Sequence, residues 1–312
     1  MKVLLTGCAG FIGINLTSRL LNEGYEVIGV DNFITSSPEN IKQFKSNPNF
    51  RFIEHDISLP LHLDEQVSWI LHFASPASPV HYLKYPIKTL KAGLLGTYNC
   101  CGIAKLQNAK LLFASTSEVY GDPTVHPQRE EYWGNVNTTG PRSCYDESKR
   151  AAEALIFAYK RQHNVDVKVI RIFNTYGPFM QPDDGRVISN FIVQALRGEK
   201  LTVYGDGSQT RSFCYIDDLI EGIMRFMHSD FCGPINFGNP NEYRILEVAE
   251  IIKEITGATS EIEFFPLPED DPKRRCPDIT KAKELLKWEP VVPLEEGLKK
   301  TIEYFRGKIR NA

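Results

Sequence analysis

The fold is decided by the stretch Val3-Leu4-Leu5-Thr6-Gly7-Cys8-Ala9-Gly10-Phe11-Ile12-Gly13, close to the start of the sequence. It begins with a short apolar run, Val3-Leu4-Leu5, which is typical of a short buried strand. The three glycines predict a tight turn, and residues 14–22 then show apolar side chains at helical spacing. A second apolar strand is predicted at 25–30 and ends on Asp31. Strand, turn, helix and strand within about 30 residues predict a right-handed βαβ unit.

The same alternation continues along the chain. Apolar segments at 50–54, 69–73, 110–115 and 167–173 predict strands, and residues 86–106 and 146–163 predict helices. This order predicts an α/β fold, a Rossmann-type doubly wound parallel sheet with helices on both faces. After residue 178 Gly and Pro become frequent, and helices are predicted at 217–227 and 245–256. We therefore expect one domain from residues 1–175 plus about 212–240, and a smaller α/β lobe from about 176–211 and 241–312.

Composition narrows the class of protein. The 312 residues include 36 Lys+Arg and 39 Asp+Glu, a net charge of −3, which argues against nucleic acid as a partner. No apolar run approaches the roughly 18–20 residues that cross a bilayer, and the apolar start of the chain is too short for a signal peptide. The seven Cys form no C-x-x-C pair, which favours reduced thiols over disulfides or a zinc site. We expect a cytoplasmic protein without a membrane segment or a metal.

The glycine turn predicts a dinucleotide site. Gly7 permits the tight turn, Gly10 lets the backbone approach a diphosphate, and Gly13 lets helix and strand pack closely. The spacing is G-x-x-G-x-x-G rather than G-x-G-x-x-G. A carboxylate at Asp31 accepts hydrogen bonds from ribose hydroxyls and repels a 2′-phosphate, which favours NAD over NADP. Asp56 suits either the adenine edge or the N-cap of a helix. The residues expected to contact NAD are Gly7, Gly10, Phe11, Ile12, Gly13, Asp31, Asn32, Asp56, Ile57, Ala74, Ser115, Tyr145 and Lys149.

Tyr145 and Lys149 form the candidate catalytic pair. Residues four apart share one face of a helix, so the ammonium can reach both the phenol and a bound ribose. Its positive charge is expected to lower the pKa of the phenol from about 10. The phenolate can then take a hydroxyl proton as a hydride leaves the same carbon. The string Ser115-Thr116-Ser117-Glu118 ends the preceding strand, where such sheets place ligands.

Together with the glycine triplet and the Tyr145/Lys149 pair, the strings STSEVYG at 115–121 and RIFNTYGP at 171–178 resemble the extended short-chain dehydrogenase/reductase family of nucleotide-sugar enzymes. Within it, the strings at 72–82, 140–147 and 270–279 are most similar to the branch that converts UDP-glucuronate to UDP-xylose. The similar 4,6-dehydratases carry Asp where Ser117 stands, although GDP-mannose dehydratases share Thr-Ser-Glu, and the 4-epimerases lack Glu118. A 4,6-dehydratase, a 4-epimerase and a non-catalytic NAD-sensing protein remain the alternatives.

The resemblance implies a mechanism of oxidation at C4, loss of CO2 and renewed reduction. Tyr145 takes the C4 hydroxyl proton, Thr116 hydrogen-bonds the C4 oxygen, and Lys149 anchors the ribose of NAD. Glu118 positions the sugar or a water, while Arg275 holds the carboxylate or assists proton delivery.

The resemblance also implies a UDP-sugar site and a dimer. The two phosphates of UDP are negatively charged, so we expect several basic residues to converge on them. Arg211 matches the diphosphate arginine of the family. The substrate-binding residues expected are Ser117, Asn174, Arg186, Asn190, Tyr204, Arg211 and Arg275, with Asn174 at the sugar phosphate and Tyr204 facing the uracil. A surface salt bridge is the alternative for Arg186. Similar enzymes form homodimers through the helices that correspond to 86–106 and 146–163.

Overall fold

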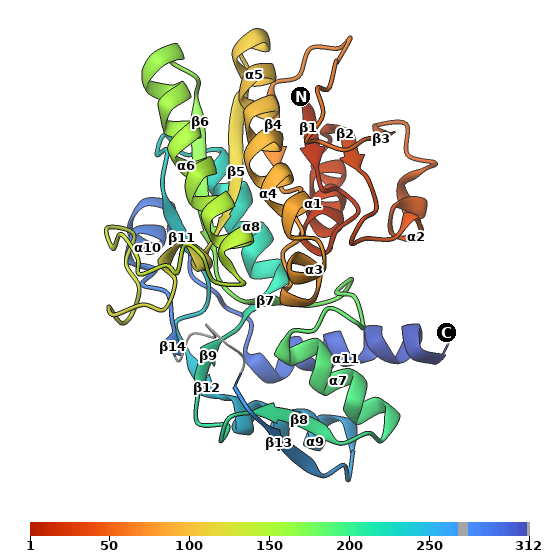
Figure 1. Cartoon of the computed structure of the whole chain (residues 1–312). Helices are drawn as coiled ribbons and strands as arrows, with labels where there is room; N and C mark the ends of the chain where they lie inside the picture. The colour runs from red at the N-terminus through yellow and green to blue at the C-terminus, as the bar shows by residue number, and fades with distance from the viewer. Residues whose placement is uncertain (268–273, 311–312) are drawn as a thin grey trace.

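A sheet of seven parallel strands forms the centre of the computed structural model, which describes residues 1–267 and 274–310 (Figure 1). The strands run in the order β11-β6-β5-β4-β1-β2-β3. The order reverses beside β1, and ligands bind sheets of this kind at the carboxyl edge near such a reversal. The predicted doubly wound sheet is therefore confirmed. The strands are β1 (Lys2–Thr6), β2 (Glu26–Asp31), β3 (Phe50–Glu54), β4 (Trp69–His72), β5 (Lys110–Thr116), β6 (Val167–Ile172) and β11 (Ile235–Phe237).

Helices cover both faces of this sheet because alternate strand residues point to opposite sides. In β1, Val3 and Leu5 pack in one core with α1 (Phe11–Asn22) and α8 (Ile216–Met227). Leu4, between them, packs in a second core with α5 (Thr97–Gln107) and α6 (Ser143–His163). Burial on both faces explains why these strands are apolar throughout.

The helix predicted at 86–106 is present but interrupted. It consists of α4 (Pro86–Lys91), one π-helical turn η2 (Ala92–Gly96), and α5. Two glycines in the π turn let neighbouring elements come close. A Cβ on Gly93 would lie 2.5 Å from Ser148 Oγ of α6, and one on Gly96 would lie 2.9 Å from Ile57 Cγ2. The interruption therefore sits where α6 packs tightly against this helix.

A smaller set of elements lies below the carboxyl edge of the sheet in Figure 1. It contains a parallel pair, a three-stranded sheet in the order β12-β9-β14, and several helices. The helix predicted at 245–256 has those bounds. The members are α7 (Val187–Arg197), β8 (Leu201–Tyr204), β9 (Thr210–Ser212), β12 (Glu242–Arg244), α9 (Ile245–Thr256), β13 (Ile262–Phe265), β14 (Arg274–Arg275) and α11 (Leu294–Arg310). Helix α10 (Thr280–Leu286) instead packs beside β11 and α8 of the larger set.

Short elements complete the chain and bring residues to the edge of the sheet. The pair β7 (Thr175–Tyr176) and β10 (Cys214–Tyr215) links the two sets of elements. The others are α2 (Pro38–Ile41), η1 (Lys42–Phe44), α3 (Pro79–Lys84) and η3 (Ser117–Tyr120). Within the described residues, no helix has both the length and the apolar character needed to cross a membrane.

Candidate active site

The glycine turn forms a close-packed cradle between β1 and α1. Gly7 has a φ of 75° and donates its N–H to Val30 O over 2.7 Å. A Cβ on Gly13 would lie 2.0 Å from Gly7 O, and one on Gly7 would lie 2.8 Å from Ala74 N. The N-cap residue Gly10 offers no side chain to the first N–H groups of α1, and the first turn holds no acidic residue. These N–H groups border the cavity described below and fit a diphosphate.

Asp31 stands at the carboxyl end of β2 beside this cradle. Its Oδ2 accepts a hydrogen bond from Ala9 N over 3.0 Å, and its Oδ1 accepts bonds from Phe33 N and Ser36 Oγ, each 2.9 Å long. These bonds fix the carboxylate next to the turn, as binding of an adenosine ribose requires. The glycine cradle and this fixed carboxylate together fit NAD.

A cavity of about 610 Å³ extends from the cradle along the carboxyl edge of the sheet. It brings together most of the residues predicted from the sequence. They are Gly7, Gly10, Phe11, Ile12, Gly13, Ser115, Thr116, Ser117, Glu118, Tyr145, Lys149, Asn174, Arg186, Asn190, Tyr204, Arg211 and Arg275.

Five residues predicted to contact the cofactor do not line this cavity: Asp31, Asn32, Asp56, Ile57 and Ala74. Asp56 Oδ1 accepts bonds from Ser58 N and Ser58 Oγ, so its side chain caps a local turn. Ile57 is buried, and Asn32 is exposed and accepts a bond from Ile34 N.

Tyr145 and Lys149 lie in the first turns of α6, facing the end of β5. Both are almost fully buried, and the Thr116 side chain acts to lower the pKa of Tyr145. Lys149 Nζ donates to Ala114 O over 2.8 Å and lies 5.7 Å from the centre of the Tyr145 ring. The i, i+4 spacing therefore places both groups at the sheet edge, as predicted.

The expected lowering of the pKa of Tyr145 by Lys149 is wrong for the protein alone. Burial raises the pKa of Tyr145 to about 12, and only Thr116 and Arg186 act in the opposite direction among its main influences. Burial also lowers the pKa of Lys149 to about 7, against a smaller opposing effect of Glu153. The lysine is thus only partly charged near neutral pH, and desolvation outweighs attraction.

Glu118 lies between two guanidinium groups, and all three residues line the cavity. Its Oε2 is 2.7 Å from Arg142 Nη2, and its Oε1 pairs with Arg275 Nη1. Arg275 also donates from Nη2 to Gly121 O over 2.9 Å. Although burial opposes ionisation, Arg275 and Arg142 lower the pKa of Glu118, so it is a carboxylate. The two residues predicted for the sugar and its acid group thus pair with each other.

Sequence reasoning assigned no role to two residues in this part of the cavity, Arg142 and Tyr82. The Tyr82 ring stacks on the Tyr145 ring with centroids 5.2 Å apart and planes 5° apart. Among the residues that the structure describes, its buried hydroxyl has no hydrogen-bond partner, and neither has Arg275 Nε. The sequence did offer one sign of a role for Arg142, which precedes the candidate base Tyr145 by three residues.

The predicted substrate residues approach the cavity from the smaller set of elements. Arg211 comes from β9 and donates to Thr210 O over 2.9 Å. Arg186, at the N-cap of α7, donates to Ala77 O over 2.9 Å and lies 3.3 Å from Asp184 Oδ1. Tyr204 is 46% exposed at the end of β8. Arg186, Arg211 and Tyr204 therefore all line the cavity. Two guanidinium groups and an aromatic ring suit the phosphates and the base of a nucleoside diphosphate.

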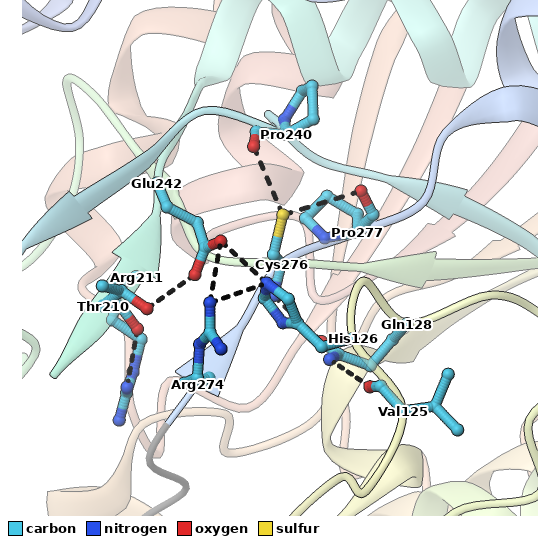
Figure 2. Close-up of polar contacts among 10 residues, drawn as sticks. All are labelled: Val125, His126, Gln128, Thr210, Arg211, Pro240, Glu242, Arg274, Cys276 and Pro277. Atoms are coloured by element: carbon cyan, nitrogen blue, oxygen red, sulfur yellow. Dashed lines mark hydrogen bonds and ion pairs between the residues drawn. The ribbon is translucent and has the colours of Figure 1, made fainter.

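Strand β14, which carries Arg275, is held by the cluster drawn in Figure 2. His126 Nε2 lies 2.8 Å from Glu242 Oε2, and Arg274 Nη2 lies 3.4 Å from the same ring nitrogen. His126, Glu242 and Cys276 place potential ligand atoms within 4.8 Å of one another. The Arg274 guanidinium points at both His126 and Glu242 in Figure 2, and its charge opposes a cation there. Of the string at 270–279 that carries the family resemblance, residues 270–273 lie outside the described residues.

Residues 3–236 match the NAD dependent epimerase/dehydratase family. The chain belongs to this family, as its fold and its glycine cradle indicate, and its cofactor is NAD. The resemblance to extended short-chain dehydrogenases/reductases is thereby confirmed.

Two curated relatives that share one name match nearly the whole chain. UDP-glucuronic acid decarboxylase 1 of Xenopus tropicalis is 55% identical over 310 residues, which are 99% of this chain and 73% of the relative. UDP-glucuronic acid decarboxylase 6 of Arabidopsis thaliana is 54% identical over 307 residues, 98% of this chain and 89% of the relative. Among solved structures, UDP-glucuronic acid 4-epimerase from Bacillus cereus with UDP-glucuronic acid and NAD is 30% identical, with a TM-score of 0.88 and coverage of 99% of this chain and 100% of that chain.

Proposed function

We propose that this protein is an NAD-dependent decarboxylase that converts UDP-glucuronate to UDP-xylose. Relatives with the matching name are 52–55% identical to nearly the whole chain. The observation that carries the proposal is the part of the cavity wall where Arg142 and Arg275 lie near the buried Tyr82 phenol, which has no hydrogen-bond partner within the described residues. A carboxylate is the sugar substituent that such a site recognises, because charge-assisted bonds to guanidinium groups are the strong ones.

Tyr145, Thr116 and Lys149 perform the proton chemistry at C4 in this proposal. Bound NAD supplies the redox chemistry, taking two electrons from C4 and later returning them. Tyr145 Oη accepts the C4 hydroxyl proton and gives it back when C4 is reduced. Thr116 and the charge of Arg186 favour the phenolate, while Lys149 binds the ribose. The cradle of Gly7, Gly10 and Gly13 holds the diphosphate, and Asp31 holds the other ribose.

Arg142, Arg275 and Tyr82 hold the acid group during loss of CO2. Oxidation at C4 produces a β-keto acid, whose C5–C6 bond can break with the electron pair delocalised onto the C4 oxygen. Glu118 keeps the two guanidinium groups in place. The Tyr82 hydroxyl and Arg275 Nε have no partner within the described residues and are available to carboxylate oxygens. The sugar is thereby held with C4 at Tyr145 and its acid group at the arginines.

Product analysis by NMR, with UDP-glucuronate and NAD, tests this proposal. We expect UDP-xylose and CO2. A 4-epimerase, the activity named in the structural neighbours, gives a UDP-uronate that keeps its carboxylate. A 4-keto-6-deoxy product from dTDP-glucose or GDP-mannose indicates a dehydratase, and NAD binding without turnover of any of these sugars indicates a sensor. Any of these three results in place of UDP-xylose refutes the proposal.

We also propose a homodimer formed through α4, η2, α5 and α6. Large apolar side chains are exposed along the first three of these elements, including Ile87 at 68%, Leu94 at 40% and Tyr98 at 54%. Such a stripe is typical of a protein–protein interface. Light scattering at micromolar concentration tests the dimer, and a monomeric mass excludes it.

We further propose a cytoplasmic location and the domain division expected above. All seven Cys are free thiols, and six of them are buried, which suits a reducing compartment. Pairing of β11 with β6 supports assigning residues near 212–240 to the larger domain. Cell fractionation tests the location, and limited proteolysis between the two parts tests the division.

A further inference from the structure

The three-stranded sheet β12-β9-β14 carries two of the arginines expected to bind the substrate. Arg211 of β9 and Arg275 of β14 stand directly opposite each other in a parallel pairing. Both line the cavity, and so do Gln209 and Phe213, which alternate with other residues on either side of Arg211. Because successive residues of a strand point to opposite faces, one face of this sheet forms part of the cavity wall. The relative position of the two guanidinium groups therefore depends on how β9 and β14 are held together.

Glu242 of β12 spans the opposite face of the same sheet. It stands opposite Ser212 in the antiparallel pairing of β12 with β9, and its Oε1 accepts a hydrogen bond from Thr210 Oγ1 over 2.6 Å. Its Oε2 lies 2.8 Å from His126 Nε2 and 4.0 Å from Arg274 Nη2. Figure 2 shows the carboxylate between these three partners. None of the five residues lines the cavity. Thr210 and Arg274 are opposite each other, immediately before the two arginines of the cavity wall.

Strand β14 depends on contacts of this kind, because it has two residues and lies at the edge of its sheet. The segment that contains His126 also holds the residue after β14. In that segment, Gln128 N donates to Cys276 O over 2.8 Å, and Gln128 Oε1 accepts a hydrogen bond from Cys276 N over 2.9 Å. Arg274 is 61% exposed, so its attraction to Glu242 contributes little. Glu242 therefore acts mainly through Thr210 and His126, which belong to the two segments that hold β14.

We propose that Glu242 is a positioning residue that fixes the separation of Arg211 and Arg275 and thereby favours a sugar nucleotide with an acid group. This inference rests on the proposed function, in which Arg211 binds the diphosphate and Arg275 the sugar carboxylate. A ligand that uses both arginines binds tightly only when their separation matches its own length, because hydrogen bonds weaken when donors are misplaced. A ligand that uses Arg211 alone is insensitive to that separation. Loss of Glu242 should therefore weaken binding of UDP-glucuronate far more than binding of UDP.

Calorimetric titration of the NAD-loaded protein tests this inference, with Tyr145→Phe in every variant to prevent turnover. The ligands are UDP-glucuronate, UDP-glucose, which has no carboxylate, and UDP. For Glu242→Ala we expect Kd for UDP-glucuronate to rise at least tenfold, and Kd for UDP-glucose and UDP to change less than threefold. Glu263→Ala is the matched control. It removes a carboxylate from β13 that lies 4.0 Å from Lys200 Nζ and does not line the cavity, so all three Kd values should stay within twofold.

If Glu242→Ala does not fold, Thr210→Val removes the hydrogen bond to β9 and keeps a side chain that suits a strand. It should raise Kd for UDP-glucuronate at least threefold without changing Kd for UDP. An equal loss for all three ligands indicates general destabilisation and overturns the inference, as does an unchanged Kd for UDP-glucuronate. Neither result affects production of UDP-xylose by the unmodified protein. If the unmodified protein produces no UDP-xylose, the proposed function fails and the inference fails with it.

Discussion

Gly13→Ala should disable the cofactor cradle with little change elsewhere. The added Cβ would lie 2.0 Å from Gly7 O and 2.8 Å from Gly7 C, both backbone atoms that no side-chain rotation can move. Restoring an ordinary contact of 3.4 Å requires the start of α1 and the turn to separate by about 1.4 Å. Overpacking of this kind costs about 1–3 kcal/mol, and it also displaces the N–H groups that face the diphosphate. We expect NAD affinity to fall at least tenfold and the melting temperature to fall by several degrees.

The matched control is Gly307→Ala, another glycine within a helix. A Cβ on Gly307 meets nothing within 4 Å, so the change should stabilise α11 by up to about 1 kcal/mol through helix propensity. Calorimetric titration with NAD and thermal unfolding of both variants provide the measurements. A Gly13→Ala protein that binds NAD as tightly as the unchanged protein refutes the assignment of this turn.

Three further predictions concern the ionisable groups of the site. Tyr145→Phe removes the base for the C4 hydroxyl and should lower kcat by about 100- to 10,000-fold with little change in Kd for UDP-glucuronate; wild-type turnover contradicts its role. Because burial lowers the pKa of Lys149 to about 7, the unfolded chain holds more protons between pH 7 and pH 10, and stability of the NAD-free protein should rise with pH there. Lys149→Met should flatten that rise in thermal unfolding, and an unchanged slope excludes the explanation. Glu118→Gln leaves Arg142 and Arg275 without their carboxylate and should cost about 3–5 kcal/mol in urea denaturation, with UDP-glucuronate stabilising the variant more than UDP-glucose does.

The sequence predicted the features that depend on local pattern. The parallel sheet follows from short apolar strands that alternate with helices, and α9 follows from its helical spacing. The glycine turn was predictable because Gly7 requires a positive φ and Gly13 a close approach. Tyr145 and Lys149 share a helix face whatever the tertiary structure is, and their place after β5 indicated a ligand site.

The remaining parts of the site depend on contacts between distant segments and on burial. Glu118, Arg142 and Arg275 meet only because η3, the start of α6 and β14 come together, which no spacing in the sequence encodes. The pKa of Tyr145 could not be predicted either, because attraction by Lys149 is overcome by desolvation that only packing reveals. The π turn at Ala92–Gly96 likewise lies where α6 approaches Gly93, a contact between segments distant in the sequence.

The first turn of α6 connects the two ends of the proposed reaction. Tyr145 faces Thr116 at the end of β5, where C4 of the sugar would react, while Arg142, the N-cap residue of the same helix, pairs with Glu118. Because Arg142 and Tyr145 lie three residues apart at the start of one helix, the backbone fixes the positions from which they reach the two ends of the sugar. Tyr82 stacks on Tyr145 and lines the cavity, so its ring supports the position of the Tyr145 ring. A decarboxylase of this kind needs both fixed points at once, since the C5–C6 bond breaks only when the neighbouring C4 has become a ketone and the carboxylate is already held.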